Sequence, residues 1–125
     1  MSCSSLAIDH IQIAMPIGGE AKAREFFGML LRLEELPKPS DMAARGGCWF
    51  AVGEHQIHLG VEADFRPAKK AHIALRSDSL TELRARFEAA GYATFDDVPV
   101  DGRHRFFSSD PFGNRIEFLE ARPQQ

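Results

Sequence analysis

Three histidines and one glutamate, each set in an apolar stretch, are the side chains of this sequence best suited to bind a metal ion. His10 and His72 open two similar stretches, one near the start of the chain and one near its middle. After each of these stretches comes a helix-like segment and then a strand-rich segment. The last strand-like stretch contains His58 in the first half and Glu117 in the second. Matching polar residues in two repeated halves predict side chains that converge on a pseudo-twofold axis. Three imidazoles and a carboxylate at one centre would suit Zn, Fe, Ni, Co or Mn, and the sequence does not choose among these metals.

The sequence around His58 and Glu117 indicates that their side chains could point away from the apolar core. Both His58 and Glu117 lie between two apolar neighbours, and successive residues of a strand point to opposite faces. A metal ion with positions left for water or substrate would polarise a carbonyl or enediolate oxygen, and Glu117 or His58 could move a proton as the catalytic residue. Alone, each histidine could equally be an ordinary hydrogen-bonded residue, but four matching positions favour a metal site.

Five further side chains are candidates for contacting a substrate. Gln12 and Gln56 share strand faces with His10 and His58, and Trp49 is the sole tryptophan. Arg103 and Arg105 belong to a set of loop cations that could steer a carboxylate or phosphate by charge-assisted hydrogen bonds. The other members of that set are Arg45, Arg66, Lys69 and Lys70. The alternatives are a solvated surface for each cation and a core position for the tryptophan.

The elements that must position these residues follow from periodicity. Residues 6–14 alternate as a strand, and residues 20–33 carry a helical apolar stripe. Residues 48–52 and 56–62 are predicted strands of the first half, with 37–47 a loop. In the second half, Ser79 and Glu82 fit a capping box for a helix that ends at Gly91. Residues 92–95, 105–108 and 115–120 are its predicted strands.

Composition limits the possible partners. A chain of 125 residues predicts one domain, 1–125, made of two modules at about 6–62 and 71–120. The net charge of −3, with both signs interspersed, favours a small-molecule ligand over nucleic acid or a membrane. We expect Cys3 and Cys48 to be reduced thiols in a cytoplasmic protein, because two cysteines do not make a secreted disulfide framework. The first residues lack the pattern of an export signal, and no apolar run approaches the length of a membrane span.

Three motifs resemble the vicinal oxygen chelate superfamily, which includes glyoxalase I, bleomycin-resistance proteins, fosfomycin-resistance proteins and extradiol dioxygenases. They are Asp9-His10-Ile11, Ala71-His72-Ile73-Ala74-Leu75 and Asp110-Pro111-Phe112-Gly113-Asn114-Arg115-Ile116-Glu117. The resemblance implies an α+β fold of paired βαβββ modules, with cupped mixed sheets and helices on the outer face. It also implies a divalent metal and a homodimer.

The resemblance places metal ligands at His10, His58, His72 and Glu117. The resemblance to fosfomycin-resistance and extradiol members implies a metal held by three ligands, two histidines and one glutamate. His10, His72 and Glu117 could supply this set. His58 would then be an extra ligand or a base next to the ligands. Whether the ligands come from one chain or two is left open by the resemblance.

The implied function is a divalent-metal-dependent glyoxalase-like enzyme, a lyase or isomerase. It would act on a small oxygenated, possibly anionic, substrate by bidentate oxygen chelation. One alternative is a bleomycin-resistance-like protein that binds a small molecule or drug without chemistry. The other is a ring-cleaving dioxygenase, which would require ferrous iron or manganese.

Overall fold

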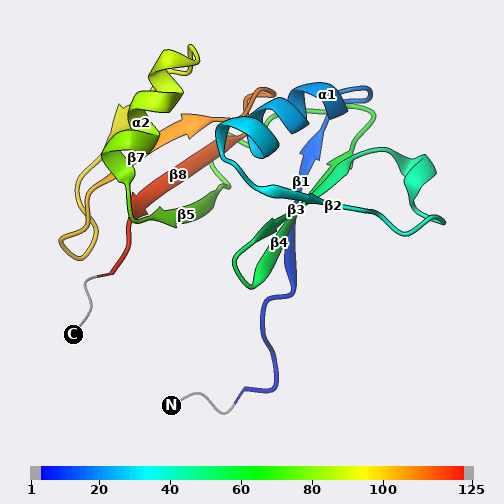
Figure 1. Ribbon diagram of the computed structural model, residues 1–125, viewed down its shortest axis with the longest axis horizontal. Coiled ribbons are helices and arrows are strands. Elements are labelled where there is room, and N and C mark those ends of the chain that lie inside the picture. The colour runs from blue at the N-terminus through cyan, green and yellow to red at the C-terminus, as the bar shows by residue number, and fades with distance from the viewer. Residues whose placement is uncertain (1–3, 123–125) are drawn as a thin grey trace. The chain divides into compact units, whose positions relative to one another are not determined.

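The computed structural model describes residues 4–122 and contains two units that share the order strand, helix, strand, strand, strand (Figure 1). The first unit ends at Phe65 and the second begins at Arg66, so each predicted module falls within one unit. The elements of the first unit are β1 (His10–Met15), α1 (Glu20–Ala23), the π-helical η1 (Arg24–Leu30), β2 (Glu34–Leu36), the short 3₁₀ helix η2 (Ala43–Arg45), β3 (Cys48–Val52) and β4 (His55–Val61). Those of the second are β5 (Ile73–Ser77), α2 (Leu80–Ala89), β6 (Phe95–Asp96), β7 (Arg105–Ser109) and β8 (Arg115–Glu120).

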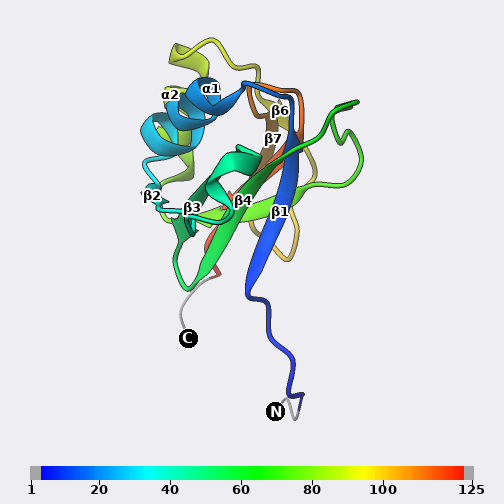
Figure 2. The ribbon, with the colours of Figure 1, turned by 90° about the vertical axis from the view of Figure 1, so that its right-hand side faces the viewer.

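Each unit contains one four-stranded mixed sheet, and neither sheet closes into a barrel. The strand orders are β1-β4-β3-β2 and β5-β8-β7-β6. In each sheet the opening strand pairs in parallel with the closing strand, and the other pairs are antiparallel. Figure 2 shows β1 lying alongside β4. The expected α+β fold of βαβββ modules is therefore observed.

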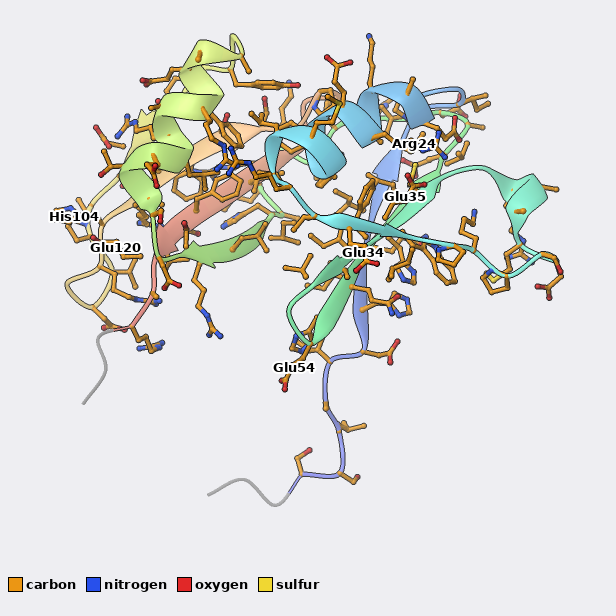
Figure 3. All side chains as sticks on the ribbon, in the orientation of Figure 1. Arg24, Glu34, Glu35, Glu54, His104 and Glu120 are labelled. Atoms are coloured by element: carbon orange, nitrogen blue, oxygen red, sulfur yellow. The ribbon has the colours of Figure 1, made fainter. Side chains whose placement is uncertain are left out.

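The core of the first unit lies between its helix and one face of its sheet. Phe27 is fully buried, and its ring contacts that of Phe50 on β3 with centroids 5.6 Å apart. A hydrogen bond links strand β2 to the helix: Arg24 Nε donates to Glu35 Oε1 at 2.9 Å (Figure 3). The predicted helix over 20–33 forms, but it ends at Leu30 and widens into a π-helix after Ala23. Strand β2 was not predicted.

The second unit has an aromatic core between α2 and its sheet. The Phe87 ring on the helix contacts Phe106 on β7 and Phe118 on β8, with centroids 5.8 and 5.0 Å away. The predicted helix is present, and Gly91 has the left-handed φ of 90° expected after its end. The predicted capping box is wrong, because Ser79 makes no side-chain cap bond. Its backbone N–H instead donates to Ser77 Oγ at 3.0 Å, which satisfies this group locally.

A buried turn fixes the start of β8. Asp110, 2 % exposed, accepts hydrogen bonds from the backbone N–H groups of Phe112 and Asn114 and from Asn114 Nδ2. Burial raises the pKa of the Asp110 carboxyl above its usual range. Asn114 Oδ1 in turn accepts from the backbone N–H of Ala68 at 2.9 Å. The turn therefore joins the connector before β5 to the strand that carries Glu117.

Two remaining features concern the environment of the chain. Within residues 4–122, no helix combines the length and the apolar character needed to cross a membrane. Cys48 is a free, buried thiol whose pKa is raised by that burial. Cys3, the other predicted thiol, lies outside the described residues.

Candidate functional site

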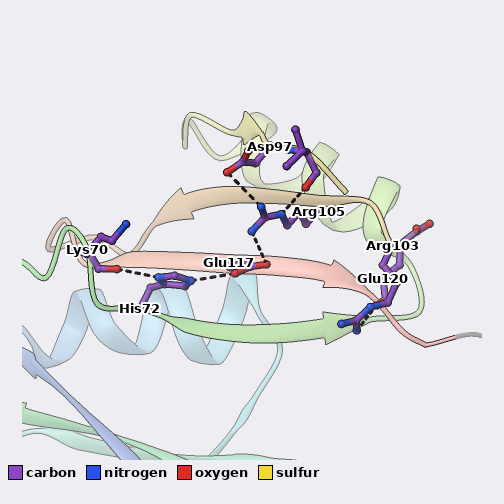
Figure 4. A network of polar contacts seen from close by, with 8 residues as sticks. Lys70, His72, Asp97, Arg103, Arg105, Glu117 and Glu120 are labelled. Atoms are coloured by element: carbon purple, nitrogen blue, oxygen red, sulfur yellow. Dashed lines mark hydrogen bonds and ion pairs between the residues drawn. The ribbon is translucent and has the colours of Figure 1, made fainter. Parts of the chain in front are cut away.

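The second unit brings His72 and Glu117 together on one face of its sheet. His72 directly precedes β5, and Glu117 on β8 pairs with Ala74 of β5. His72 Nε2 lies 3.0 Å from Glu117 Oε1, and the His72 Nδ1–H donates to the carbonyl oxygen of Lys70 at 3.0 Å (Figure 4). With Nδ1 protonated, a neutral His72 presents a lone pair at Nε2 to a carboxylate oxygen. Two facing acceptors require a cation between them, which can be a proton or a metal ion.

Arg105 holds the second oxygen of Glu117 from the neighbouring strand. Its Nη1 lies 3.3 Å from Glu117 Oε2, and its Nη2 lies 3.4 Å from Asp97 Oδ2. Arg105 Nε also donates to the carbonyl oxygen of Val98 at 2.8 Å. Its side chain is only 15 % exposed, so these contacts occupy most of the guanidinium. Arg105 is thus placed to orient the Glu117 carboxylate rather than to reach a substrate freely.

Arg103 lies elsewhere. Its Nη1 donates to the backbone carbonyl of Glu120 at 3.3 Å, at the end of β8 remote from His72 (Figure 4). Arg103 Nε is buried and has no hydrogen-bond partner within the described part of the chain. The structure therefore separates Arg103 from the His72–Glu117 pair, although the sequence grouped it with Arg105.

The first unit places His10 and His58 together in an aromatic stack. The His58 ring on β4 lies between His10 on β1 and Trp49 on β3, with centroids 4.1 and 4.0 Å away and interplanar angles of 12° and 5°. His58 is 5 % exposed, and its Nε2–H donates to Gln56 Oε1 at 2.8 Å. Burial lowers the pKa of His58 below its usual value, and the charge of His10 adds to this effect. His58 is therefore kept as a neutral imidazole.

His10 is held differently from His58. Its Nδ1–H lies 2.9 Å from Asp9 Oδ2, which leaves Nε2 unoccupied by that contact. This hydrogen bond lowers the pKa of the Asp9 carboxyl. A histidine whose Nδ1 is fixed by a carboxylate or a carbonyl presents Nε2 to a metal, and His10 and His72 both have this arrangement.

A cavity of about 300 Å³ in the first unit is lined by His10, Gln12, Trp49 and His58, together with Lys38 and Arg45. Gln12 lies over Gly60 of the adjacent strand, where a Cβ atom would come within 2.5 Å of Gln12 Nε2. Gly60 therefore makes room for the Gln12 amide. Sequence reasoning missed this glycine, and a glycine inside a strand is the signal that could have found it.

The His72–Glu117 pair has the spacing of two ligands bound to one metal ion. Two ligand atoms bound to one ion at about 2.0–2.2 Å lie roughly 3 Å apart, as His72 Nε2 and Glu117 Oε1 do. The rings of His10 and His58 lie in nearly parallel planes, 12° apart with centroids separated by 4.1 Å, so lone pairs in the two ring planes do not meet at one ion. Of these two histidines, His10 has its Nδ1 engaged by Asp9, whereas His58 has its Nε2 engaged by Gln56.

The structure assembles two of the four predicted ligands in each unit. Over residues 4–122, no three His, Cys, Asp or Glu side chains form a group placed to hold a metal ion. The convergence of His10 with the His72–Glu117 pair therefore stays a prediction.

Comparisons with known proteins place these two βαβββ units in the vicinal oxygen chelate class. A glyoxalase family protein from Bacillus anthracis is 44 % identical, with a TM-score of 0.90, 98 % of this chain covered and 100 % of that one. The chain therefore belongs to the glyoxalase family. Neither a protein-family model nor a curated protein matches it.

Two more distant structures show the fold alone. A fosfomycin resistance protein from Listeria monocytogenes, solved with Mn(II) and 1S,2S-dihydroxypropylphosphonic acid, is 16 % identical with a TM-score of 0.77, covering 93 % of this chain and 92 % of that chain. An antibiotic binding protein from Streptomyces is 21 % identical with a TM-score of 0.70, covering 94 % and 99 %. Proteins of this fold therefore include both metal-containing and antibiotic-binding members.

Proposed function

We propose that the protein is a divalent-metal-dependent enzyme that binds a small oxygenated substrate through two of its oxygen atoms. The observation that carries this proposal is the His72 Nε2–Glu117 Oε1 pair, 3.0 Å apart, in which a neutral His72 with Nδ1 protonated and the carboxylate each direct an acceptor atom at the same point. The manganese in the Listeria protein of the same fold supports a divalent ion. Imidazole and carboxylate ligands suit Zn, Fe, Ni, Co and Mn.

The proposed ligands are His10, His72 and Glu117. When bound, the ion would supply Lewis-acid polarisation of a substrate carbonyl or enediolate oxygen. The Lys70 carbonyl sets the tautomer of His72, and Arg105 fixes the orientation of the Glu117 carboxylate. These contacts preorganise the two ligands before any substrate arrives.

Proton transfer is assigned to His58 rather than to Glu117. Both Glu117 oxygens are engaged, one by His72 and one by Arg105. The Nε2–H of His58 donates to Gln56, so its Nδ1 carries the lone pair that could accept a proton. Gln12 and Trp49, which line the same cavity, would contact the substrate.

The test is the metal content of protein purified without a metal-affinity tag. We expect about one ion per pair of His72 and Glu117, and Glu117→Gln should weaken retention about 10-fold or more, because the ligand loses its charge while keeping its shape. Glu54→Gln, at an exposed turn, is the matched control and should retain metal as the parent does. Equal metal content in all three proteins after dialysis against a weak chelator would refute the proposal.

A second candidate function is ligand binding without chemistry, which the antibiotic binding protein of the same fold favours. Such a binder would hold its ligand equally well with and without metal. A ring-cleaving dioxygenase is a further enzymatic alternative and would need ferrous iron or manganese specifically. Identification of the bound metal separates this alternative from a lyase or isomerase that uses zinc, nickel or cobalt.

The same proposal includes a cytoplasmic homodimer. Strand β1 is an edge strand of its sheet; Ile8, two residues before it, and Ile11 within it are 62 % and 39 % exposed. Apolar side chains along an open sheet edge favour pairing with a second copy of the chain.

A further inference from the structure

The second unit has a cavity of about 390 Å³ that the proposed metal chemistry does not explain. Its lining includes Phe95 of β6, Phe107 and Ser109 of β7, Arg115 of β8, and Lys69 of the connector before β5. A volume of this size suits a small organic molecule.

The cavity has an aromatic wall with a guanidinium laid on it. Phe107 is buried, and the Arg115 guanidinium carbon lies 3.9 Å from its ring centroid. Phe95, which pairs with Phe107 across the strands, is 62 % exposed although it is apolar. A planar guanidinium stacked on one ring keeps its edge donors for an anion and its second face for another flat group.

The charges of the cavity do not cancel. Its two acidic residues are already paired, Asp96 with Arg84 and Asp97 with Arg105. Within residues 4–122, neither Lys69 nor Arg115 makes an ion pair. Two uncompensated cations therefore face a pocket whose acids are neutralised, which favours an anionic ligand.

We propose that this cavity binds a carboxylate that is attached to an aromatic ring. The carboxylate would be held by Arg115 and Lys69, because a guanidinium edge matches a carboxylate in a two-point contact. The ring would lie on the exposed Phe95, and the Ser109 hydroxyl is a further donor at the cavity wall.

The position of the cavity connects it with the metal ligands. Phe107 pairs directly with Glu117 across β7 and β8, and Arg115 lies two residues before Glu117 on the same strand face. A molecule anchored on Arg115 would thus extend over the face that carries the His72–Glu117 pair. The binding of an aromatic acid in this cavity does not depend on the proposed function. Its identification as the substrate, an aromatic acid with further oxygen atoms, rests on the proposed function.

Binding of phenylacetate to metal-free protein, measured by titration calorimetry after dialysis against a strong chelator, tests the inference. Phenylacetate should bind about 10-fold or more tightly than the neutral phenylacetamide, because only the acid can form charge-assisted hydrogen bonds. Arg115→Met and Lys69→Met should each weaken phenylacetate binding by a similar factor. Arg115→Lys should fall between the parent and Arg115→Met, because it keeps the charge and loses the planar fork.

The matched control is Arg76→Met, which removes an exposed cation from β5 outside the cavity and should leave binding unchanged. Circular dichroism melting of each variant shows whether it is folded. Equal binding of the acid and the amide, or unchanged binding in both folded Arg115→Met and folded Lys69→Met, would overturn the inference. If the protein as purified without a metal-affinity tag contains no metal but still binds phenylacetate, the proposed function is overturned and the aromatic-acid site stands.

Discussion

At the scale of single residues, the three histidines differ in which ring nitrogen is already occupied. His10 and His72 have Nδ1 fixed, by Asp9 and by the Lys70 carbonyl, whereas His58 has Nε2 engaged by Gln56. The sequence predicted all three as ligands because residue type and spacing do not reveal ring orientation. That orientation depends on Trp49 and on the side-chain amide of Gln56, which reach His58 only through sheet pairing and the alternation of β4.

This difference predicts unequal effects on metal affinity. His72→Gln should weaken metal binding about 10-fold or more, because it removes a ligand that is already oriented. His58→Gln should change the affinity by less than about 3-fold while lowering turnover, since His58 is assigned to proton transfer and not to the metal. Competition with a chromogenic chelator measures both affinities. A loss in His58→Gln as large as that in His72→Gln would restore the set of four ligands.

The arginines show where charge patterning failed. Arg105 was expected to contact substrate, but its ion pairs with Glu117 and Asp97 make it a residue that positions Glu117. Arg115, which faces a cavity without an acidic partner, was overlooked because it was treated as part of the final turn and strand. Counting two residues back from Glu117 along β8 would have found it, since alternate residues share a strand face.

At the scale of elements, segments with strong local periodicity were predicted well. Strands β3, β7 and β8 and helix α2 lie within one residue of the bounds expected from apolar patterning. Strand β2 was missed because Glu34–Leu36 is short and carries two glutamates, so its strand conformation comes from pairing with β3 and from the Arg24–Glu35 contact. Long-range contacts of this kind leave no local pattern in the sequence.

The entry to β3 depends on a glycine that approaches backbone closely. Gly47 has φ of 85°, and a Cβ atom there would lie 2.0 Å from the carbonyl oxygen of Leu59. Gly53, in the turn after β3, has φ of 56° and open space around the same position. The two glycines share the left-handed backbone and differ in crowding.

We therefore expect Gly47→Ala to destabilise the fold more than Gly53→Ala. The control, Gly53→Ala, should lower the free energy of unfolding by about 1 kcal/mol because of left-handed strain. Gly47→Ala should lower it by at least roughly 2 kcal/mol more, because the backbone must also move. Urea unfolding followed by circular dichroism gives both free energies. Equal costs would mean that the Gly47 loop relaxes freely and does not set the position of Trp49 two residues later.

At the scale of the whole molecule, the chain repeats one supersecondary unit and changes the chemistry of its face. The first sheet carries a histidine stack and two amides, and the second carries a histidine–glutamate pair fixed by an arginine. The internal repeat of the sequence predicted the shared topology, because the apolar positions of both halves have the same periodicity. It could not predict that each pair forms within its own unit, which depends on the parallel pairing of opening and closing strands.

The open edge of β1 leads to an expectation about assembly. A homodimer with a total interface above about 1,000 Å² should form before any ligand is added, because Ile8 just before β1 and Ile11 on β1 leave apolar surface at an edge strand. Light scattering at low micromolar concentration should give twice the mass of one 13.9 kDa chain. Ile11→Lys should shift this mass toward the monomer, whereas Ile17→Lys, at a position 72 % exposed outside the strands, should not. A monomer that still retains metal tightly would mean that all ligands come from one chain and that β1 is not an interface.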